Sequence, residues 1–404
     1  MRRLAVLSFH TSPLTQPGTG DGGGMNVYVR ELSSALAGAG VECEVFTRSW
    51  AHGLPAVQEV EPGFRVHHVP AGPLASVAKE ELGEHLDEFT AGVLQRIGES
   101  GPPDVIHANY WLSGVSGHVL KHRLELPLVS TFHTLARVKA EEAAEEHDRR
   151  ARAEAEVIGC SDAILASSDD EAAQLERLYG AVPERIEVVP PGVDHHLFLP
   201  GDRRAARAEL GLGDEPVLLF VGRIQPLKGA DVAVRALAAL PQRHATLVLV
   251  GGPSGPDGEA ELGRLHDLVA TLSLGDRVRF VAPLPHGELT AYYRAADVCL
   301  VPSRSESFGL VALEAASCGT PVVAAAVGGL RGLVADGRTG FLVEGRDPED
   351  YAACVGRLLD DPALAAALSI EATARARRYR WSITAARLRR LYADLTARQL
   401  VECR

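Results

Sequence analysis

The chain of 404 residues is 46% hydrophobic and 23% charged, a balance typical of globular proteins, and its length predicts two domains. An excess of acidic over basic residues, 53 against 41, gives a formal net charge of −12 and argues against a nucleic acid as partner. No apolar run approaches the roughly 20 residues of a membrane span. The apolar stretch near the N-terminus is too short for a signal peptide, so we expect a first buried strand and a cytoplasmic protein.

Short β-rich runs alternate with amphipathic stretches along the first half of the chain. One helical pattern, residues 26–40, closes on Gly38 and Gly40, as helix C-termini commonly do. This alternation predicts parallel α/β units. We expect strands at Leu4–Phe9, Glu42–Thr47, Val105–His107, Leu128–Thr131, Ala163–Ala166 and Glu187–Val189.

A Pro- and Gly-rich stretch at Pro190–Asp214 interrupts the alternation, and we interpret it as an interdomain linker. The alternation restarts with the runs PVLLFVGR, ATLVLVGG, RVRFVAPL, DVCLVPS and PVVAAAVGG. The sequence therefore predicts an α/β protein of two doubly wound, Rossmann-like domains, residues 1–200 and 201–385, that face each other across a cleft. A terminal helix, 386–404, is expected to pack back toward the N-terminal domain. Ligands of such domains bind at the carboxyl ends of the strands.

The six cysteines are scattered along the chain without a C-x-x-C pair. This spacing predicts neither a disulfide framework nor a zinc site, and we expect most of them to be small core residues in a reducing cytoplasm. They are Cys43, Cys160, Cys299, Cys318, Cys354 and Cys403.

A glycine-rich loop near the N-terminus contains a literal G-x-G-x-x-G at Gly18, Gly20 and Gly23. In a nicotinamide dehydrogenase these glycines follow the first strand directly, and an acidic residue at the end of the second strand holds the ribose. Here the glycines come after a loop broken by two prolines, and the second strand ends at Arg48. The loop is therefore not interpreted as an NAD site.

The run FVGRIQPLKG places Arg223 just beyond a buried strand, with Lys228 five residues later and Gly229 at the start of a helix. Two cations and a helix N-terminus suit a diphosphate. No GxxxxGK[ST] occurs, so this is not a P-loop. The competing interpretation is two solvated surface charges.

The run PSRSESFGLVALEAASCGTPVVAA carries two carboxylates, Glu306 and Glu314, among apolar and small residues. If a helix begins near Gly309, the four residues Ser307, Phe308, Gly309 and Leu310 offer backbone N–H groups to a phosphate, and the two carboxylates can accept hydrogen bonds from sugar hydroxyls and from a ribose. An exposed helix face is the ordinary alternative, but an unpaired carboxylate in apolar surroundings would be costly.

These motifs resemble those of retaining glycosyltransferases of the GT-B fold. ESFGLVALE matches their E-x7-E motif, VGRIQPLKG their Arg/Lys diphosphate motif, and GDGGGMNVYVREL their donor-facing glycine loop. The resemblance covers essentially the whole chain. With HTSPLTQPGTGDGGGMNVYV, YWLSG and GGPSGP, it is strongest to the D-inositol-3-phosphate N-acetylglucosaminyltransferases of mycothiol biosynthesis.

For the donor, the resemblance implies that Arg223 and Lys228 neutralise the departing diphosphate and that Glu306 holds the donor sugar together with the backbone of residues 307–310. It implies that Glu314 holds the ribose and that the backbone of Leu284 contacts uracil. His133, at the end of a buried strand, would lie beside the anomeric carbon; without the resemblance, a structural histidine is the simpler interpretation. The glycines that let the loop approach the diphosphate are Gly22, Gly23 and Gly24.

For the acceptor, the resemblance implies that one phosphate is bound by four residues of the N-terminal domain: Lys79, Tyr110, Thr134 and Arg150. Cations and hydroxyl donors suit a phosphomonoester, although Lys79 and Arg150 alone could equally be surface charges. Arg149 and Arg152 remain alternatives to Arg150, because the acidic run before them is shorter than in the family. Asn26 would face the inositol hydroxyls, with His10 close to the same site.

The expected reaction is transfer of GlcNAc from UDP-GlcNAc to 1L-myo-inositol 1-phosphate (D-inositol 3-phosphate) with retention and release of UDP. Lys228, Arg223, His133 and Glu306 form the expected catalytic set. No D-x-D motif is evident, so no metal is expected to be obligatory, although Mg²⁺ accompanying the phosphates is compatible with the pattern. A homodimer would be unsurprising for the family. The alternatives are a natural-product (aminocyclitol or other small alcohol) glycosyltransferase, a sucrose-phosphate synthase-like enzyme, and a non-catalytic nucleotide-sugar-binding protein.

Overall fold

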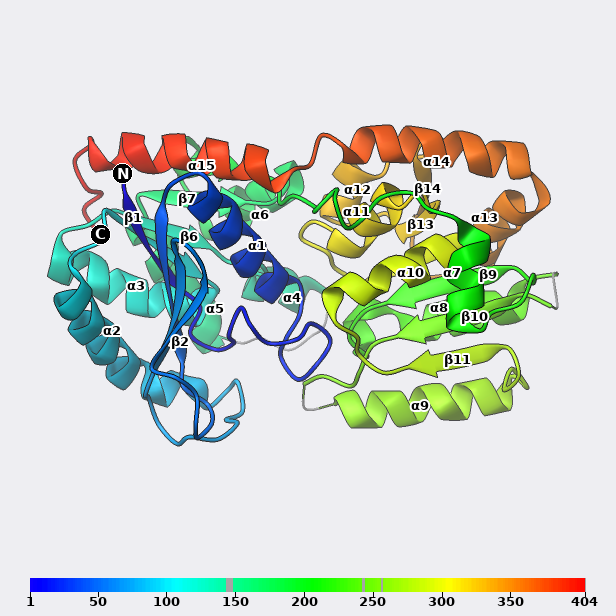
Figure 1. Cartoon of the computed structure of the whole chain (residues 1–404), viewed down its shortest axis with the longest axis horizontal. Coiled ribbons are helices and arrows are strands. Elements are labelled where there is room, and N and C mark those ends of the chain that lie inside the picture. Colours follow the sequence, from blue (N-terminus) through cyan, green and yellow to red (C-terminus); the bar gives the residue numbers. More distant parts are fainter. Residues whose placement is uncertain (143–147, 242–243, 256, 404) are drawn as a thin grey trace. The chain divides into compact units, whose positions relative to one another are not determined.

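The computed structural model describes residues 1–142, 148–241, 244–255 and 257–403. They form two compact units, each built on one sheet (Figure 1). The first unit comprises residues 1–15, 25–191 and 381–404, and the second comprises residues 16–24 and 192–380.

The first unit contains an eight-stranded sheet in the order β3-β4-β2-β1-β5-β6-β7-β8, parallel except for the pair β3·β4. Its strands are β1 (Arg3–Leu7), β2 (Glu42–Arg48), β3 (Val57–Glu61), β4 (Phe64–Val69), β5 (Val105–Asn109), β6 (Leu128–Thr131), β7 (Ala163–Ala166) and β8 (Ile186–Val188). Its α-helices are α1 (Gly24–Gly38), α2 (Leu86–Ser100), α3 (Trp111–Leu124), α4 (Ala136–Glu142), α5 (Asp148–Cys160), α6 (Asp169–Tyr179) and α15 (Trp381–Thr396).

Successive residues of β1 face opposite sides of this sheet, so each side has its own core. Leu4 and Val6 pack with α1 and with α15, the red helix of Figure 1. Ala5 and Leu7 pack with α2 and α3. The last long helix of the chain is therefore part of the N-terminal core.

The second unit contains a six-stranded, all-parallel sheet in the order β11-β10-β9-β12-β13-β14. In chain order this is 3-2-1-4-5-6, the order of a Rossmann sheet. The strands are β9 (Val217–Val221), β10 (Thr246–Val250), β11 (Val278–Val281), β12 (Val298–Val301), β13 (Val322–Ala325) and β14 (Gly340–Val343). The α-helices are α7 (Arg203–Leu210), α8 (Ala230–Ala239), α9 (Gly258–Thr271), α10 (Leu289–Ala295), α11 (Leu310–Ser317), α12 (Gly329–Leu333), α13 (Pro348–Asp360) and α14 (Pro362–Ala376).

The observed units differ from the expected domains of residues 1–200, 201–385 and 386–404. The first boundary falls after Pro191, and the returning segment begins at Trp381. The crossing between the units, at Pro191 and Gly192, lies within the expected linker, but most of that stretch is packed structure of the second unit. Phe198 is fully buried in the core of this unit, and α7 packs there too. The glycine loop at 16–24 also belongs to the second unit, although the residues before and after it belong to the first.

Three strands were not expected from the sequence. β3 and β4 form a hairpin around Gly63, whose φ of 84° suits glycine. β3 is an exposed edge strand, so its side chains carry no apolar alternation. β14 is a short strand on the other sheet's edge.

The expectation of no disulfide was wrong for one pair of cysteines. The structure joins Cys160, at the end of α5, to Cys403 in the C-terminal tail, with 4.6 Å between their Cα atoms. The two residues are 243 positions apart, which no local spacing rule could connect. Cys43, Cys299 and Cys318 are buried thiols, as expected.

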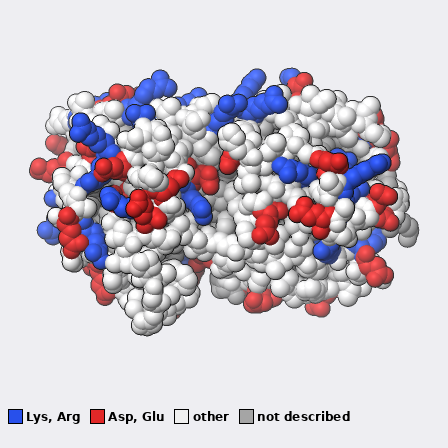
Figure 2. All heavy atoms as spheres, in the orientation of Figure 1, with Lys and Arg blue, Asp and Glu red and all other residues white. Residues whose placement is uncertain are grey.

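No helix among the described residues is long and apolar enough to cross a membrane. On the face drawn in Figure 2, acidic and basic side chains are interspersed.

Candidate active site

The donor residues expected from the sequence lie at the carboxyl ends of β9 and β12. These neighbouring strands are where the order of the second sheet reverses, the place at which doubly wound sheets bind ligands. Arg223 follows β9, and Lys228 ends a short 3-10 helix, η3 (Pro226–Lys228). Glu306 lies in the loop after β12. Lys228 Nζ donates to Glu306 Oε2 at 2.7 Å, so the structure brings these two residues together.

The loop that carries Glu306 is clamped by two glycines at the start of α12. Gly329 N donates to the carbonyl oxygen of Glu306 at 2.9 Å. A Cβ on Gly329 would lie 2.5 Å from the Cα of Phe308, and one on Gly328 would overlap the Glu306 carbonyl. Gly309 has a φ of 103° and caps α11. The backbone of residues 307–310 thus enters a helix N-terminus, as expected.

Glu314 lies one turn into α11 and is almost fully buried. His286 Nε2 contacts one of its carboxylate oxygens at 2.7 Å, and the Tyr293 hydroxyl donates to the other, also at 2.7 Å. Burial, and next the charge of Glu314, raise the pKa of Tyr293 well above its ordinary value, so the phenol stays protonated. Leu284, just after β11, packs its side chain on the core of the second unit. The sequence did not point to His286 or Tyr293.

The glycine loop packs on the second unit beside Arg223. Gln16 Nε2 donates to the Pro283 carbonyl at 2.9 Å, and Ser254 Oγ donates to the carbonyl of Gly20. A Cβ on Gly23 would lie 3.2 Å from Arg223 Nε. Gly22 closes the loop by accepting from the N–H of Gly18, and Gly24, the last loop residue of the second unit, lies beside Leu310. Ser254 belongs to the GGPSGP run, which the sequence linked to the family without assigning it a contact.

In the first unit, the structure brings together the four residues expected to bind the acceptor phosphate. Tyr110 lies after β5 with a φ of 74° and caps α3. Lys79 Nζ lies 4.5 Å from the centroid of the Tyr110 ring, and Arg150 Cζ lies 5.0 Å from it. Arg150 Nη2 donates to Thr134 Oγ1 at 3.0 Å and to the Thr134 carbonyl at 2.7 Å. Two cations and two hydroxyl-bearing residues therefore cluster where this sheet also reverses its order, between β1 and β5.

Arg150 is held in place by buried Glu154. Its Nε donates to Glu154 Oε1 at 2.7 Å, and the other carboxylate oxygen accepts from the Ala136 N–H at 2.9 Å. By contrast, Arg149 and Arg152 are exposed. The geometry therefore favours Arg150 among the three arginines as a member of the cluster.

Lys79 has no carboxylate partner in the part of the chain that the structure describes. The loop that precedes it is fixed by Arg48, the last residue of β2. Arg48 Nη1 donates to the Pro73 carbonyl at 2.7 Å, and Nη2 donates to the Ala75 carbonyl at 2.6 Å. Arg48, which stands where an NAD site would have an acidic residue, thus fixes the loop that carries Lys79.

His133 follows β6 in the left-handed region, with a φ of 61°. Its Nε2 lies 2.9 Å from Asn109 Oδ1, and its ring meets Tyr28 edge-on at 4.9 Å. Burial, and next the charge of His107, lower the pKa of His133 to about 3, so the imidazole is neutral at physiological pH. A neutral ring can accept or donate hydrogen bonds but does not supply a positive charge.

The two remaining acceptor residues differ in their surroundings. The centroid of the His10 ring lies 4.4 Å from the centroid of the Tyr110 ring, so His10 lies beside the cationic cluster. Asn26 is buried, and its Nδ2 donates to Thr11 Oγ1 at 2.7 Å and to the Ser12 carbonyl at 2.5 Å. Asn26 therefore fixes the loop that carries His10.

Two Rossmann-like units, each with its polar residues at a reversal of strand order, define a protein of the GT-B class. Two family models match the chain: "Glycosyltransferase Family 4" over residues 22–197 and "Glycosyl transferases group 1" over residues 202–375. The chain belongs to this glycosyltransferase family and is an enzyme.

The relatives include D-inositol 3-phosphate glycosyltransferase 2 of Catenulispora acidiphila, which is 51% identical over 416 residues, covering 100% of this chain and 96% of that protein. The D-inositol 3-phosphate glycosyltransferase of Acidothermus cellulolyticus is 50% identical over 409 residues, covering 98% of this chain and 91% of that protein. Among solved structures, sucrose-phosphate synthase from Thermosynechococcus elongatus is 38% identical with a TM-score of 0.93, covering 98% of this chain and 100% of that one.

Proposed function

We propose that this enzyme transfers GlcNAc from UDP-GlcNAc to D-inositol 3-phosphate, with retention at the anomeric carbon and release of UDP. The observation that carries the proposal is the grouping of Lys79, Tyr110, Thr134 and Arg150, which come from four separate segments of the first unit. Two cations beside hydroxyl groups suit a phosphomonoester dianion. The names of the relatives at about 50% identity specify an inositol phosphate as acceptor.

The donor would bind to the second unit. Lys228 and Arg223 neutralise the diphosphate as it leaves, and Glu306 accepts hydrogen bonds from sugar hydroxyls. Donor binding would place the diphosphate between Lys228 and the glycine loop. Glu314 reaches the ribose, with its carboxylate oriented by His286 and Tyr293. Leu284 supplies backbone contacts to uracil, and Mg²⁺ is at most an accessory ion on the phosphates.

Retention follows if the acceptor attacks on the face from which UDP departs. The bond between the anomeric carbon and the phosphate oxygen breaks, the inositol oxygen bonds to that carbon, and the departing phosphate takes the hydroxyl proton. This route asks no side chain to act as a covalent nucleophile. Neutral His133 would contact the donor sugar near the anomeric carbon. Because this route uses no nucleophilic side chain, catalysis rests on positioning the two substrates and on stabilising the charge of the leaving diphosphate.

Sucrose-phosphate synthase chemistry is the second candidate, because a synthase is 38% identical to this chain over 98% of its length. Its acceptor would be fructose 6-phosphate, which also offers a phosphomonoester. A natural-product transferase with a neutral acceptor fits less well, because nothing in such an acceptor would neutralise Lys79.

A turnover matrix tests the proposal. UDP-GlcNAc, UDP-glucose, GDP-glucose and ADP-glucose are crossed with D-inositol 3-phosphate, fructose 6-phosphate and 2-deoxystreptamine, and released nucleotide and product mass are measured. We expect efficient turnover only for UDP-GlcNAc with D-inositol 3-phosphate. Turnover with fructose 6-phosphate instead would establish the second candidate, and turnover only with 2-deoxystreptamine would refute a phosphate site.

A further inference from the structure

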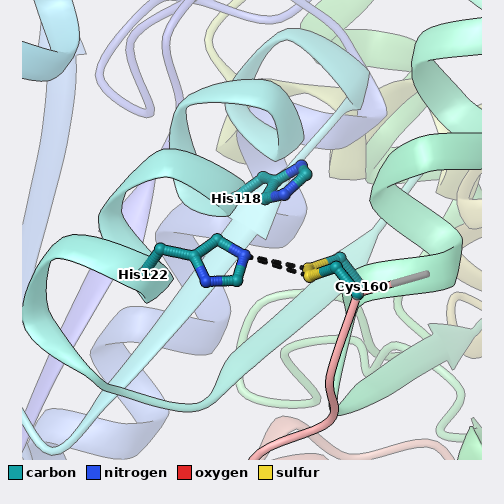
Figure 3. Close-up of side chains that lie close together, drawn as sticks. His118, His122 and Cys160 are labelled. Carbon is teal, nitrogen blue, oxygen red and sulfur yellow. Dashed lines mark hydrogen bonds between the residues drawn. A yellow bond between two sulfur atoms is a disulfide. The ribbon is translucent and has the colours of Figure 1, made fainter.

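A second group of side chains lies in the first unit, formed by residues that the proposed function does not use. His118 and His122 come from α3, Cys160 ends α5, and Cys403 lies in the C-terminal tail. One ligand atom from each residue lies within 4.8 Å of all the others. His122 Nε2 is 3.0 Å from Cys403 Sγ and 3.4 Å from Cys160 Sγ, and Figure 3 shows its ring pointing at the sulfurs with His118 one turn away.

The backbone presents these residues together. His118 and His122 are four residues apart, so both side chains lie on one face of α3. The tail is held against the same region, because Val401 N donates to Asp162 Oδ1 at 2.7 Å. The other oxygen of Asp162 accepts from buried Lys121 Nζ at 2.9 Å, so the anchor of the tail is itself fixed.

We propose that His118, His122, Cys160 and Cys403 form a zinc site in the thiol form of the chain. Two imidazole nitrogens and two thiolates are a tetrahedral donor set that zinc prefers, and four protein ligands make a closed, structural site. The two thiols each lose a proton to solvent when Zn²⁺ binds, and no electron is transferred. The metal fastens the C-terminal tail to α3 and α5.

The disulfide between Cys160 and Cys403 and the zinc site exclude each other, because both use the same two sulfur atoms. A disulfide makes no use of a histidine, whereas here an imidazole contacts both sulfurs and the ligand atom of a second imidazole lies within 4.8 Å of the other ligand atoms. The disulfide therefore leaves the two histidines unexplained, whereas a metal site in the thiol form uses all four side chains.

The test is zinc content after expression of the full chain with zinc and purification with a phosphine reductant and no chelator. We expect about one zinc per chain by elemental analysis and, after replacement by Co²⁺, the visible bands of tetrahedral cobalt with thiolate charge transfer. Cys403→Ser and His122→Ala should each lose the metal. Cys354→Ser, which changes a half-buried free thiol of the second unit, is the matched control and should keep it.

Wild-type protein with no more zinc than Cys403→Ser would overturn the site, as would unchanged zinc in both ligand variants. Thermal unfolding gives a second measurement if a variant folds poorly. A chelator should lower the melting temperature of the reduced wild-type chain and leave that of Cys403→Ser unchanged. A wild-type chain indifferent to the chelator, with only four of its six thiols reactive after denaturation without reductant, would establish the disulfide instead.

Discussion

At the scale of single residues, the ion pair between Lys228 and Glu306 is the central contact of the proposed donor site. Both side chains are partly exposed, and each is the other's charged partner at 2.7 Å. In the proposed reaction, a donor diphosphate would compete with Glu306 for the lysine, and the sugar hydroxyls would hydrogen-bond the carboxylate. The pair thus holds both groups in place before substrate arrives.

Replacing Lys228 with Met should lower kcat about 100-fold or more, because charge that develops on the leaving diphosphate loses its nearest ammonium group. Steady-state kinetics with the proposed substrates measure this effect. Arg304→Gln is the matched control, since Arg304 is an exposed cation of the same loop and should leave kcat close to that of the wild type. Near-normal kcat in Lys228→Met would contradict the assignment.

Sequence patterns at this scale identified the groups with distinctive chemistry but not those that orient them. The family resemblance pointed to Lys79, Tyr110, Thr134 and Arg150, and the structure brings them together. Glu154, which fixes Arg150, looked like one acidic residue among many. A buried carboxylate cannot be told from an exposed one before the contact across α4 and α5 is known.

At the scale of elements, the start of α12 controls the shape of the loop that carries Glu306. The glycine pair Gly328–Gly329 packs directly on the backbone of this loop. A side chain at either position must push the loop away, because backbone atoms cannot move aside as a flexible side chain can.

The variant Gly329→Ala should lose donor affinity, because its methyl group would lie 2.5 Å from the Cα of Phe308 and displace Glu306. We expect a loss of about tenfold or more in UDP-GlcNAc affinity by calorimetry, because Glu306 would lose its hydrogen bonds to the sugar hydroxyls, on the scale of a misplaced charged hydrogen bond. Gly332→Ala in the same helix meets no atom within 4 Å and should bind UDP-GlcNAc like the wild type. Equal affinities of the two variants would refute the role of this helix.

Strands with continuous apolar runs were predictable, and those with a polar face were not. Leu128–Thr131 and Ala163–Ala166 coincide with β6 and β7, since buried parallel strands have no polar alternation to obscure them. The hairpin β3·β4 was not predicted from the sequence, because the side chains of its outer strand, β3, are largely exposed. The expected linker Pro190–Asp214 contains the crossing between the units but is too long, because Pro and Gly there shape turns that still bury Phe198.

At the scale of the whole molecule, the C-terminal helix closes the core of the first unit. The Tyr392 hydroxyl of α15 contacts His107 Nδ1 of β5 at 2.9 Å, and His107 Nε2 contacts Thr131 Oγ1 at 2.8 Å. The chain therefore leaves the first unit near residue 191 and completes it only after residue 380. The expected return of the terminal helix to the N-terminal domain is confirmed, although the returning segment begins at Trp381 and not at residue 386.

Buried His107 should make the first unit less stable in mild acid. Burial lowers the pKa of His107 from 6.5 to about 3. Between these two pH values the unfolded chain binds a proton at His107, whereas the folded chain does not. The stabilisation is present above pH 6.5 and is lost as pH falls, by about 1.4 kcal/mol per pH unit. His107→Gln removes this pH-dependent contribution to the free energy of unfolding. His133, whose pKa is also lowered, contributes in the same direction in both proteins.

Tryptophan fluorescence in urea measures the effect, because Trp50, Trp111 and Trp381 all lie in the first unit. Between about pH 7.5 and about pH 5.5, the wild type should lose about 1.4 kcal/mol more unfolding free energy than His107→Gln. Parallel pH profiles for the two proteins would show that His107 titrates normally in the fold.

The central claim is that the first unit recognises the phosphate of the acceptor. Its most direct test is the ratio of kcat/KM for D-inositol 3-phosphate to that for myo-inositol, in the wild type, Lys79→Gln, Arg150→Gln and the exposed control Arg149→Gln. The ratio does not depend on the amount of folded enzyme. We predict that it falls about 10- to 100-fold in the first two variants, as expected for charged hydrogen bonds, and holds in Arg149→Gln. An unchanged ratio in Lys79→Gln and Arg150→Gln would contradict the account.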